Sequence, residues 1–194
     1  MVDGGTSVCN GYVWLYAFGG PHSFYNNTIV GGSATQNIAI TLNAGYGTPA
    51  YSLVTVHNNI SINVAYAMAD YNTSTLSGDV SASDNNVWRT GSGGAPQFVY
   101  NFGGSPTFIS FASWQGTGFD KNSSSANPSL STTYTLQSGS SAIGLAANLH
   151  GVGIGPLDSD KAGIARSLTG SWDSGAYTFG VLPSPPTGLT AVVQ

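Results

Sequence analysis

Short stretches that alternate apolar and polar residues dominate the chain, and they predict β-strands. The clearest lies at residues 36–42, where Ile38, Ile40 and Leu42 fall on one face at a period of two. A further strand is expected at residues 12–18, and a Gly-Gly-Pro turn at residues 19–21 follows it. Glycine, proline and asparagine clusters separate these runs, as is typical of strands joined by tight turns.

Three of the strand-like stretches resemble one another. Residues 23–30, 54–62 and 82–88 each place Asn-Asn between two runs of β-forming or small residues. The second asparagine recurs at positions 27, 59 and 86, in steps of 32 and 27 residues. A repeat of this length, built from strands and turns, predicts a solenoid whose turns stack on one another.

Stacking predicts a role for the repeated asparagines. Parallel turns place equivalent residues one strand spacing apart, about 4.8 Å. Asn27, Asn59 and Asn86 are therefore expected to form a ladder of amide hydrogen bonds, which satisfies polar groups that the turns would otherwise bury. This makes them scaffold; a role in ligand binding is the alternative.

Composition supports a mainly β protein and excludes several functions. Only 6% of the 194 residues are charged, all eight acidic residues are aspartates, and helices usually draw on Glu and Lys for their exposed faces. A net charge of −4 with four basic residues gives no footprint for nucleic acid or for an anionic membrane. The chain contains no long apolar run and no signal peptide, and the single Cys9 is expected to be a buried small residue.

A series of short motifs follows one another along residues 20–180. In chain order they lie at residues 24–31, 84–88, 114–115, 118–123, 127–128, 140–144, 160–166 and 173–177. Their order and spacing resemble the right-handed parallel β-helix proteins of the pectate-lyase-like superfamily. The likeness is to the C-terminal coils and closing segment found in many secreted bacterial members.

The resemblance implies a domain organisation. Residues 1–180 are expected to form an all-β, right-handed parallel β-helix (a solenoid) of few coils, as a fragment of a longer chain. Residues 181–194 combine a Pro-rich linker with a strand that resembles the start of a fibronectin type III domain. The Pro-rich linker and the strand that follows it both predict a multidomain parent protein.

The resemblance also implies a function. We expect an extracellular, carbohydrate-active protein that acts on or binds a polysaccharide, and any enzymatic activity would be that of a polysaccharide lyase or a glycoside hydrolase. The alternative is a non-catalytic surface, adhesion or filament-forming solenoid that self-associates end to end, because open solenoid ends expose strand edges.

Alternation along the repeats predicts one cluster of candidate site residues. If Phe24, Val56 and Ser83 point inward, then Tyr25, His57 and Asp84 form the neighbouring outward column. Such a trio suits sugar stacking, hydrogen bonding or general acid-base chemistry, and an ordinary exposed face is the alternative. His57 and Asp84 are assigned as catalytic residues, with Tyr25 and Trp88 as substrate-binding residues. The resemblance further implies a basic catalytic residue, as lyases of that superfamily commonly use, and Arg89 is the only basic residue on a recognisable repeat.

The remaining chemistry is sparse. The three histidines have no metal-ligand spacing, and neither a nucleophile elbow nor a phosphate-binding loop is present. No cofactor is expected, although Asp158-Ser159-Asp160 would suit Ca²⁺. Arg166 and Asp173 are expected to form a structural ion pair, and Lys121 to lie in a solvated loop.

Overall fold

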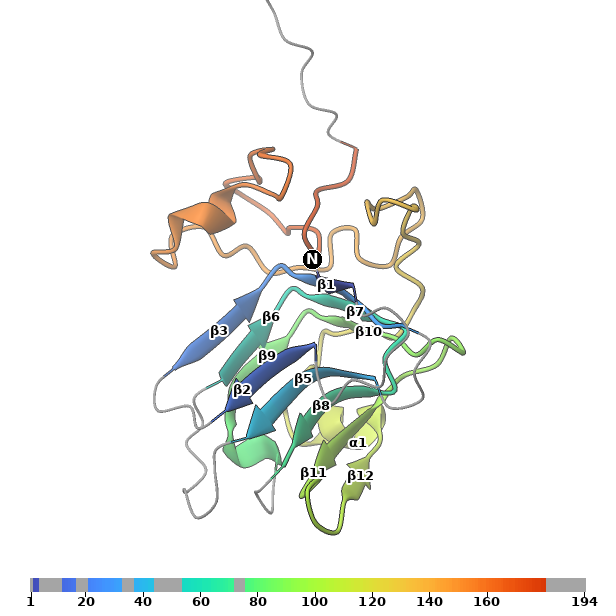
Figure 1. Cartoon of the computed structure of the whole chain (residues 1–194). Helices are drawn as coiled ribbons and strands as arrows, with labels where there is room; N and C mark the ends of the chain where they lie inside the picture. Colours follow the sequence, from blue (N-terminus) through green and yellow to red (C-terminus); the bar gives the residue numbers. More distant parts are fainter. Residues whose placement is uncertain are drawn as a thin grey trace, which may run out of the picture.

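The computed structural model describes residues 2–3, 12–16, 21–32, 37–43, 54–71 and 76–180, and these form three β-sheets with a few short helices (Figure 1). Sheet A contains β1 (Val2–Asp3), β4 (Thr28–Val30), β7 (Ile60–Ile62) and β10 (Val87–Trp88). Sheet B contains β2 (Val13–Tyr16), β5 (Ile38–Asn43), β8 (Tyr66–Asp70), β11 (Gln97–Tyr100) and β12 (Thr107–Ile109). Sheet C contains β3 (His22–Tyr25), β6 (Val54–His57) and β9 (Val80–Asp84). The helices are η1 (Leu76–Gly78), α1 (Phe111–Gly116) and η2 (Gly155–Asp158). Cys9 and the predicted linker and strand at 181–194 lie outside the described residues.

Successive strands visit the sheets in a constant order. From β1 to β11 the chain passes through sheets A, B and C in turn, and each strand pairs in parallel with the strand one circuit later. Two parallel strands need a long connection between them, and here that connection runs through one strand of each of the other two sheets. Among the described strands only β12 pairs antiparallel, with β11, at the edge of sheet B. The prediction of a mainly β protein with parallel strands is confirmed.

The space between the sheets holds the main hydrophobic core. Alternation in β6 buries Val54 and Val56, whereas Thr55 and His57 are only half-buried. The buried members of this core come from all three sheets, from η1 and α1 and from the turn before β8, and they are Ile29, Ala39, Ile40, Leu42, Val54, Val56, Val64, Ala67, Met68, Leu76, Val80, Trp88, Phe98 and Trp114. Burial of this apolar surface, at about 25 cal/mol per Å², is the main force that holds the sheets together.

The first asparagine of each pair makes the turn from sheet C to sheet A. Asn26, Asn58 and Asn85 have φ values of 55°, 63° and 57°, in the left-handed region. Asparagine adopts this conformation more readily than most non-glycine residues. The repeated position therefore bends the chain in the same way in three successive circuits.

The second asparagine of each pair forms the predicted ladder. The Asn27 side-chain Nδ2 donates to Asn59 Oδ1 at 3.0 Å, and Asn59 Nδ2 donates to Asn86 Oδ1 at 3.0 Å. The backbone N–H groups of Asn27 and Asn59 donate to the same two oxygens, each at 2.9 Å. The ladder then ends on a carboxylate, because Asn86 Nδ2 donates to Asp120 Oδ1 at 2.9 Å.

Helix α1 lies over one end of the core. Ser110 caps its N-terminus by accepting the N–H of Ser113 at 3.1 Å. The buried Trp114 ring stacks on Phe98 at 4.9 Å and on Phe119 at 4.7 Å between ring centroids. The helix follows β12 directly, with only Ser110 between them.

The closing segment (residues 140–179) packs along the asparagine turns, where Figure 1 shows it in orange and red above β3, β6 and β9. Asn58 donates through Nδ2 to the carbonyl of Ala147 and accepts its N–H through Oδ1, both at 2.9 Å. Gly175 N–H donates to the Asn58 carbonyl at 2.7 Å. Gly175 has φ of +91°, and a Cβ there would lie 2.6 Å from Ile60 Cδ1, so this close approach requires glycine.

Candidate functional site

The predicted outward column is present on sheet C. Tyr25 is paired with His57, and His57 with Asp84, in the parallel register of β3, β6 and β9. The rings of Tyr25 and His57 lie 6.2 Å apart between centroids. Val56, from the neighbouring column, is fully buried, as the alternation predicted.

His57 is a half-buried imidazole in the middle of this column. Desolvation by burial lowers its pKa, and the nearby carboxylates of Asp84 and Asp120 offset this only in part. Its Nδ1 is buried without a hydrogen-bond partner. The ring is therefore neutral at pH 7 and able to accept a proton.

Asp84 is held by a neighbouring loop. Its Oδ1 accepts the N–H of Asn122 at 2.7 Å and the N–H of Asn85 at 2.9 Å, and its Oδ2 accepts Asn122 Nδ2 at 2.7 Å. These bonds orient the carboxylate toward the loop. The column thus aligns His57 and Asp84 on adjacent strands, while both oxygens of Asp84 are engaged by Asn122 or Asn85.

A groove of about 360 Å³ opens at the Tyr25 end of the column. One wall is formed by the end of β3 and its turn, and the other by η2 and the residues that follow it. The lining residues are Tyr25, Asn26, Asn27, Pro156, Leu157, Ser159, Asp160, Lys161, Arg166 and Ala176. The groove therefore combines one aromatic ring with amide, hydroxyl, carboxylate and cationic groups.

The charged residues of the groove differ in how free they are. Lys161 is exposed. Asp160 is buried, and its carboxylate accepts the N–H groups of Ala162 at 2.8 Å, Ile164 at 2.9 Å and Thr178 at 2.9 Å. Lys161 is therefore the charged side chain of the groove best placed to meet a ligand.

Arg166 is buried beneath the groove. Burial lowers its pKa, and Asp160 and Asp173 act in the opposite direction, so the guanidinium remains a cation at neutral pH. No carboxylate of the described residues lies within 4.0 Å of it. The expected ion pair with the Asp173 side chain is therefore wrong: Arg166 instead donates to the main-chain carbonyls of Asp173 at 3.3 Å and Gly175 at 3.0 Å.

Trp88 and Arg89 do not join the column. Trp88 is fully buried, packs edge-on against Phe98 at 6.0 Å, and has no surface to offer a sugar. Arg89 follows β10 at the opposite end of that strand from Asp84, and its Nη1 donates to the carbonyl of Ser125 at 2.9 Å. The assignment of Trp88 to substrate binding is wrong, and no described contact joins Arg89 to His57 or Asp84.

Asp120 is the residue that the sequence did not single out. It is fully buried with φ of 49°, and its two oxygens accept five side-chain donors. These donors are Asn86 Nδ2, Trp88 Nε1 and Ser123 Oγ on Oδ1, with Ser83 Oγ and Trp114 Nε1 on Oδ2. Asp120 ties the asparagine ladder to α1 and lies close enough to influence the pKa of His57.

The carboxylates of Asp158 and Asp160 are not directed at a common ligand position. Asp158 Oδ1 lies 2.9 Å from His150 Nδ1, while both Asp160 oxygens accept backbone N–H groups. Among the described residues there is no cluster of three or more metal-ligating side chains. Among the described residues, no helix is long and apolar enough to cross a bilayer.

Comparisons with protein-family models, with curated proteins and with solved structures find no match for this chain.

Proposed function

We propose that this chain is the carbohydrate-binding part of an extracellular protein with a right-handed parallel β-helix fold, and that the groove beside Tyr25 binds a polysaccharide. The fold proposal is supported by the constant passage of the strands through sheets A, B and C and by the side-chain ladder along the turns. The resemblance of the motifs to secreted β-helix proteins supports the extracellular location.

The chemistry of the groove is the observation that carries the functional proposal. A polysaccharide presents many hydroxyl groups, each a donor and an acceptor, together with apolar ring faces. The groove offers amides, a hydroxyl and an ammonium for the former and the Tyr25 ring for the latter. Its volume of about 360 Å³ accommodates a sugar unit.

We propose a binding function rather than a catalytic one because the column contains only one acid-base group that is not engaged by neighbouring residues, His57. His57 is neutral and able to accept a proton, so it is the residue that a lyase or hydrolase reaction would use. Asp84 is engaged by Asn122 and Asn85, and Arg89 has no described contact with the column. A glycoside hydrolase uses two carboxyl groups, and the column supplies one.

The two lysines of the chain allow a matched test. Lys161 lines the groove, whereas Lys121 lies in the loop at the Asp84 end of the column and is not among the residues that line the groove, and both are exposed. We expect affinity electrophoresis against plant, algal and microbial polysaccharides to identify a ligand whose binding weakens about tenfold or more in Lys161→Ala. Lys121→Ala should bind as the unaltered protein does. Retention that is absent for every polysaccharide, or equal loss in both variants, would refute the proposal.

A second candidate function, self-association as a non-catalytic surface protein, is favoured by an aromatic strip on the outer face of sheet B. Its ring pairs have centroid separations of 5.3–5.8 Å, and the exposed Trp14 and Phe108 form its two ends. The members are Trp14, Tyr66, Tyr71, Phe102 and Phe108. Light scattering that detects oligomers, and their loss in Trp14→Ser, would favour this function; a monomer at all concentrations would exclude it.

A further inference from the structure

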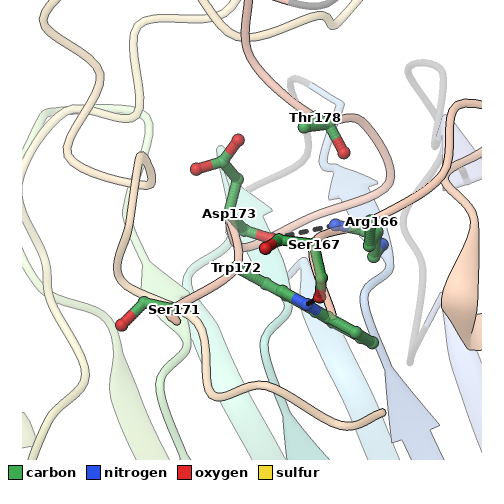
Figure 2. A pocket seen from close by; sticks show the side chains of 6 residues that line it. All are labelled: Arg166, Ser167, Ser171, Trp172, Asp173 and Thr178. Atoms are coloured by element: carbon green, nitrogen blue, oxygen red, sulfur yellow. Dashed lines mark hydrogen bonds between the residues drawn. The ribbon is translucent and has the colours of Figure 1, made fainter. Parts of the chain in front are cut away.

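A second, smaller hollow of about 60 Å³ lies within the closing segment (Figure 2). Its lining residues are Arg166, Ser167, Ser171, Trp172, Asp173 and Thr178. Trp172 forms one wall, and the Arg166 guanidinium lies 5.4 Å from the centre of its ring. The guanidinium is therefore stacked on an aromatic face, and Arg166 borders the hollow.

Arg166 is an unusual buried cation. Its exposed fraction is 4%, and within the described residues no carboxylate lies within 4.0 Å of it. Buried charges in proteins are normally paired, because desolvation of a lone ion is costly. Its Nη atoms donate to main-chain carbonyls, but Nε is buried with no partner in the protein.

The nearest acids do not supply the missing partner. The Asp173 oxygens accept the N–H groups of Gly144 at 2.8 Å and Phe179 at 2.7 Å, and Figure 2 shows the carboxylate pointing away from the guanidinium. Asp160 accepts three backbone N–H groups, two on Oδ1 and one on Oδ2. Both carboxylates are thus engaged elsewhere.

Thr178 supplies a second unpartnered group. Its Oγ1 is buried without a hydrogen-bond partner and belongs to a residue that lines the same hollow. A guanidinium N–H and a hydroxyl together match an oxyanion, which accepts from both. We propose that this hollow is a binding site for a small oxyanion, either a planar carboxylate or a tetrahedral sulfate or phosphate, which pairs with Arg166 and Thr178.

Occupancy of this site would hold the closing segment together. Arg166 and Thr178 come from two separate stretches of that segment, and an anion between them would add bonds only in the folded state. A ligand that binds only the folded state raises its stability in proportion to the logarithm of ligand concentration. The site is separate in chemistry from the polysaccharide groove, although Arg166 borders both.

The test uses the whole chain and three sodium salts, acetate, sulfate and phosphate, with sodium chloride added to hold the ionic strength constant. We expect at least one salt to raise the unfolding temperature saturably and to change tryptophan emission, because Arg166 stacks on Trp172. Saturation by acetate assigns a planar carboxylate, and saturation by sulfate or phosphate alone assigns a tetrahedral anion. An equal response to all salts, chloride included, would overturn the proposal.

Two site variants and one matched control locate the effect. Thr178→Val keeps the shape of the side chain and removes the hydroxyl, so it should weaken anion binding roughly 3- to 10-fold. Thr132→Val, at an exposed threonine of another loop, is the matched control and should leave binding unchanged. Arg166→Lys keeps the charge but loses the planar fork, and saturable binding should disappear. Unaltered binding in Thr178→Val would refute the assignment even if Arg166→Lys failed to fold.

Discussion

Asp120→Asn is the substitution that most sharply tests how the stack is held at one end. Asparagine has nearly the shape of aspartate but replaces one acceptor oxygen with an NH₂ donor. Oδ1 of Asp120 accepts three side-chain donors and Oδ2 accepts two, among them the indole N–H groups of Trp88 and Trp114. An indole N–H can only donate, so one of the two must face the new NH₂ group.

The cost can be worked out from these contacts. An unsatisfied buried donor costs about 1–3 kcal/mol, and the remaining hydrogen bonds lose the strength that a charged acceptor gives them. We therefore expect Asp120→Asn to lower the free energy of unfolding by about 3–5 kcal/mol, against a total of roughly 5–15 kcal/mol for an ordinary domain. The same change at Asp84, whose partners are the exposed Asn122 and the adjacent turn residue Asn85, should cost less than about 1 kcal/mol.

Urea unfolding followed by tryptophan emission is a suitable assay, because two of the reporting indoles donate to Asp120. The midpoint should fall strongly in Asp120→Asn and little in Asp84→Asn, with the slope unchanged in both. An Asp120→Asn protein within about 1 kcal/mol of the unaltered chain would show that the five contacts are not a stabilising network.

Three further predictions follow from the same structure. Asn59→Ala should lose about 2–4 kcal/mol because it removes the middle of the ladder, and Asn27→Ala at its half-buried end should lose clearly less; equal losses in urea unfolding would contradict the ladder. Since burial lowers the pKa of His57, the unfolded chain takes up its proton first, and stability should fall as pH drops below about 6.5. His57→Gln should remove that part of the pH dependence of the unfolding midpoint, and an unchanged pH profile would contradict it. Gly175→Ala should cost about 2 kcal/mol or more, because its Cβ would collide with Ile60, and an unchanged unfolding temperature would refute the docking of the closing segment.

The repeated residues could be predicted from the sequence because equivalent positions of successive repeats lie side by side in a stack. The Asn-Asn pairs identified equivalent turns, and once Asn27, Asn59 and Asn86 are aligned, strict alternation places Tyr25 beside His57 and His57 beside Asp84. The ladder and the outward column are both consequences of that single alignment. No long-range information beyond the repeat was needed.

The features that were missed depend on contacts outside the repeat. Alternation gives one inward and one outward face, but both faces of sheet A are covered: Trp88 points into the main core, and Val87 packs under Leu136 of the segment that follows. The pattern alone therefore could not show that Trp88 is inaccessible. Asp120 lies 34 residues after Asn86 in a stretch without a repeat, so nothing marked it as the end of the ladder. Its buried position depends on how α1 folds back.

The proposal that the groove beside Tyr25 binds a polysaccharide is tested most directly by a crystal structure with a bound oligosaccharide of the polysaccharide that the chain retains. We expect a sugar ring packed on Tyr25 and hydrogen-bonded to Lys161 within the groove. A sugar bound instead along the aromatic strip of sheet B, or one that makes no contact with Tyr25 and Lys161, would contradict the proposal.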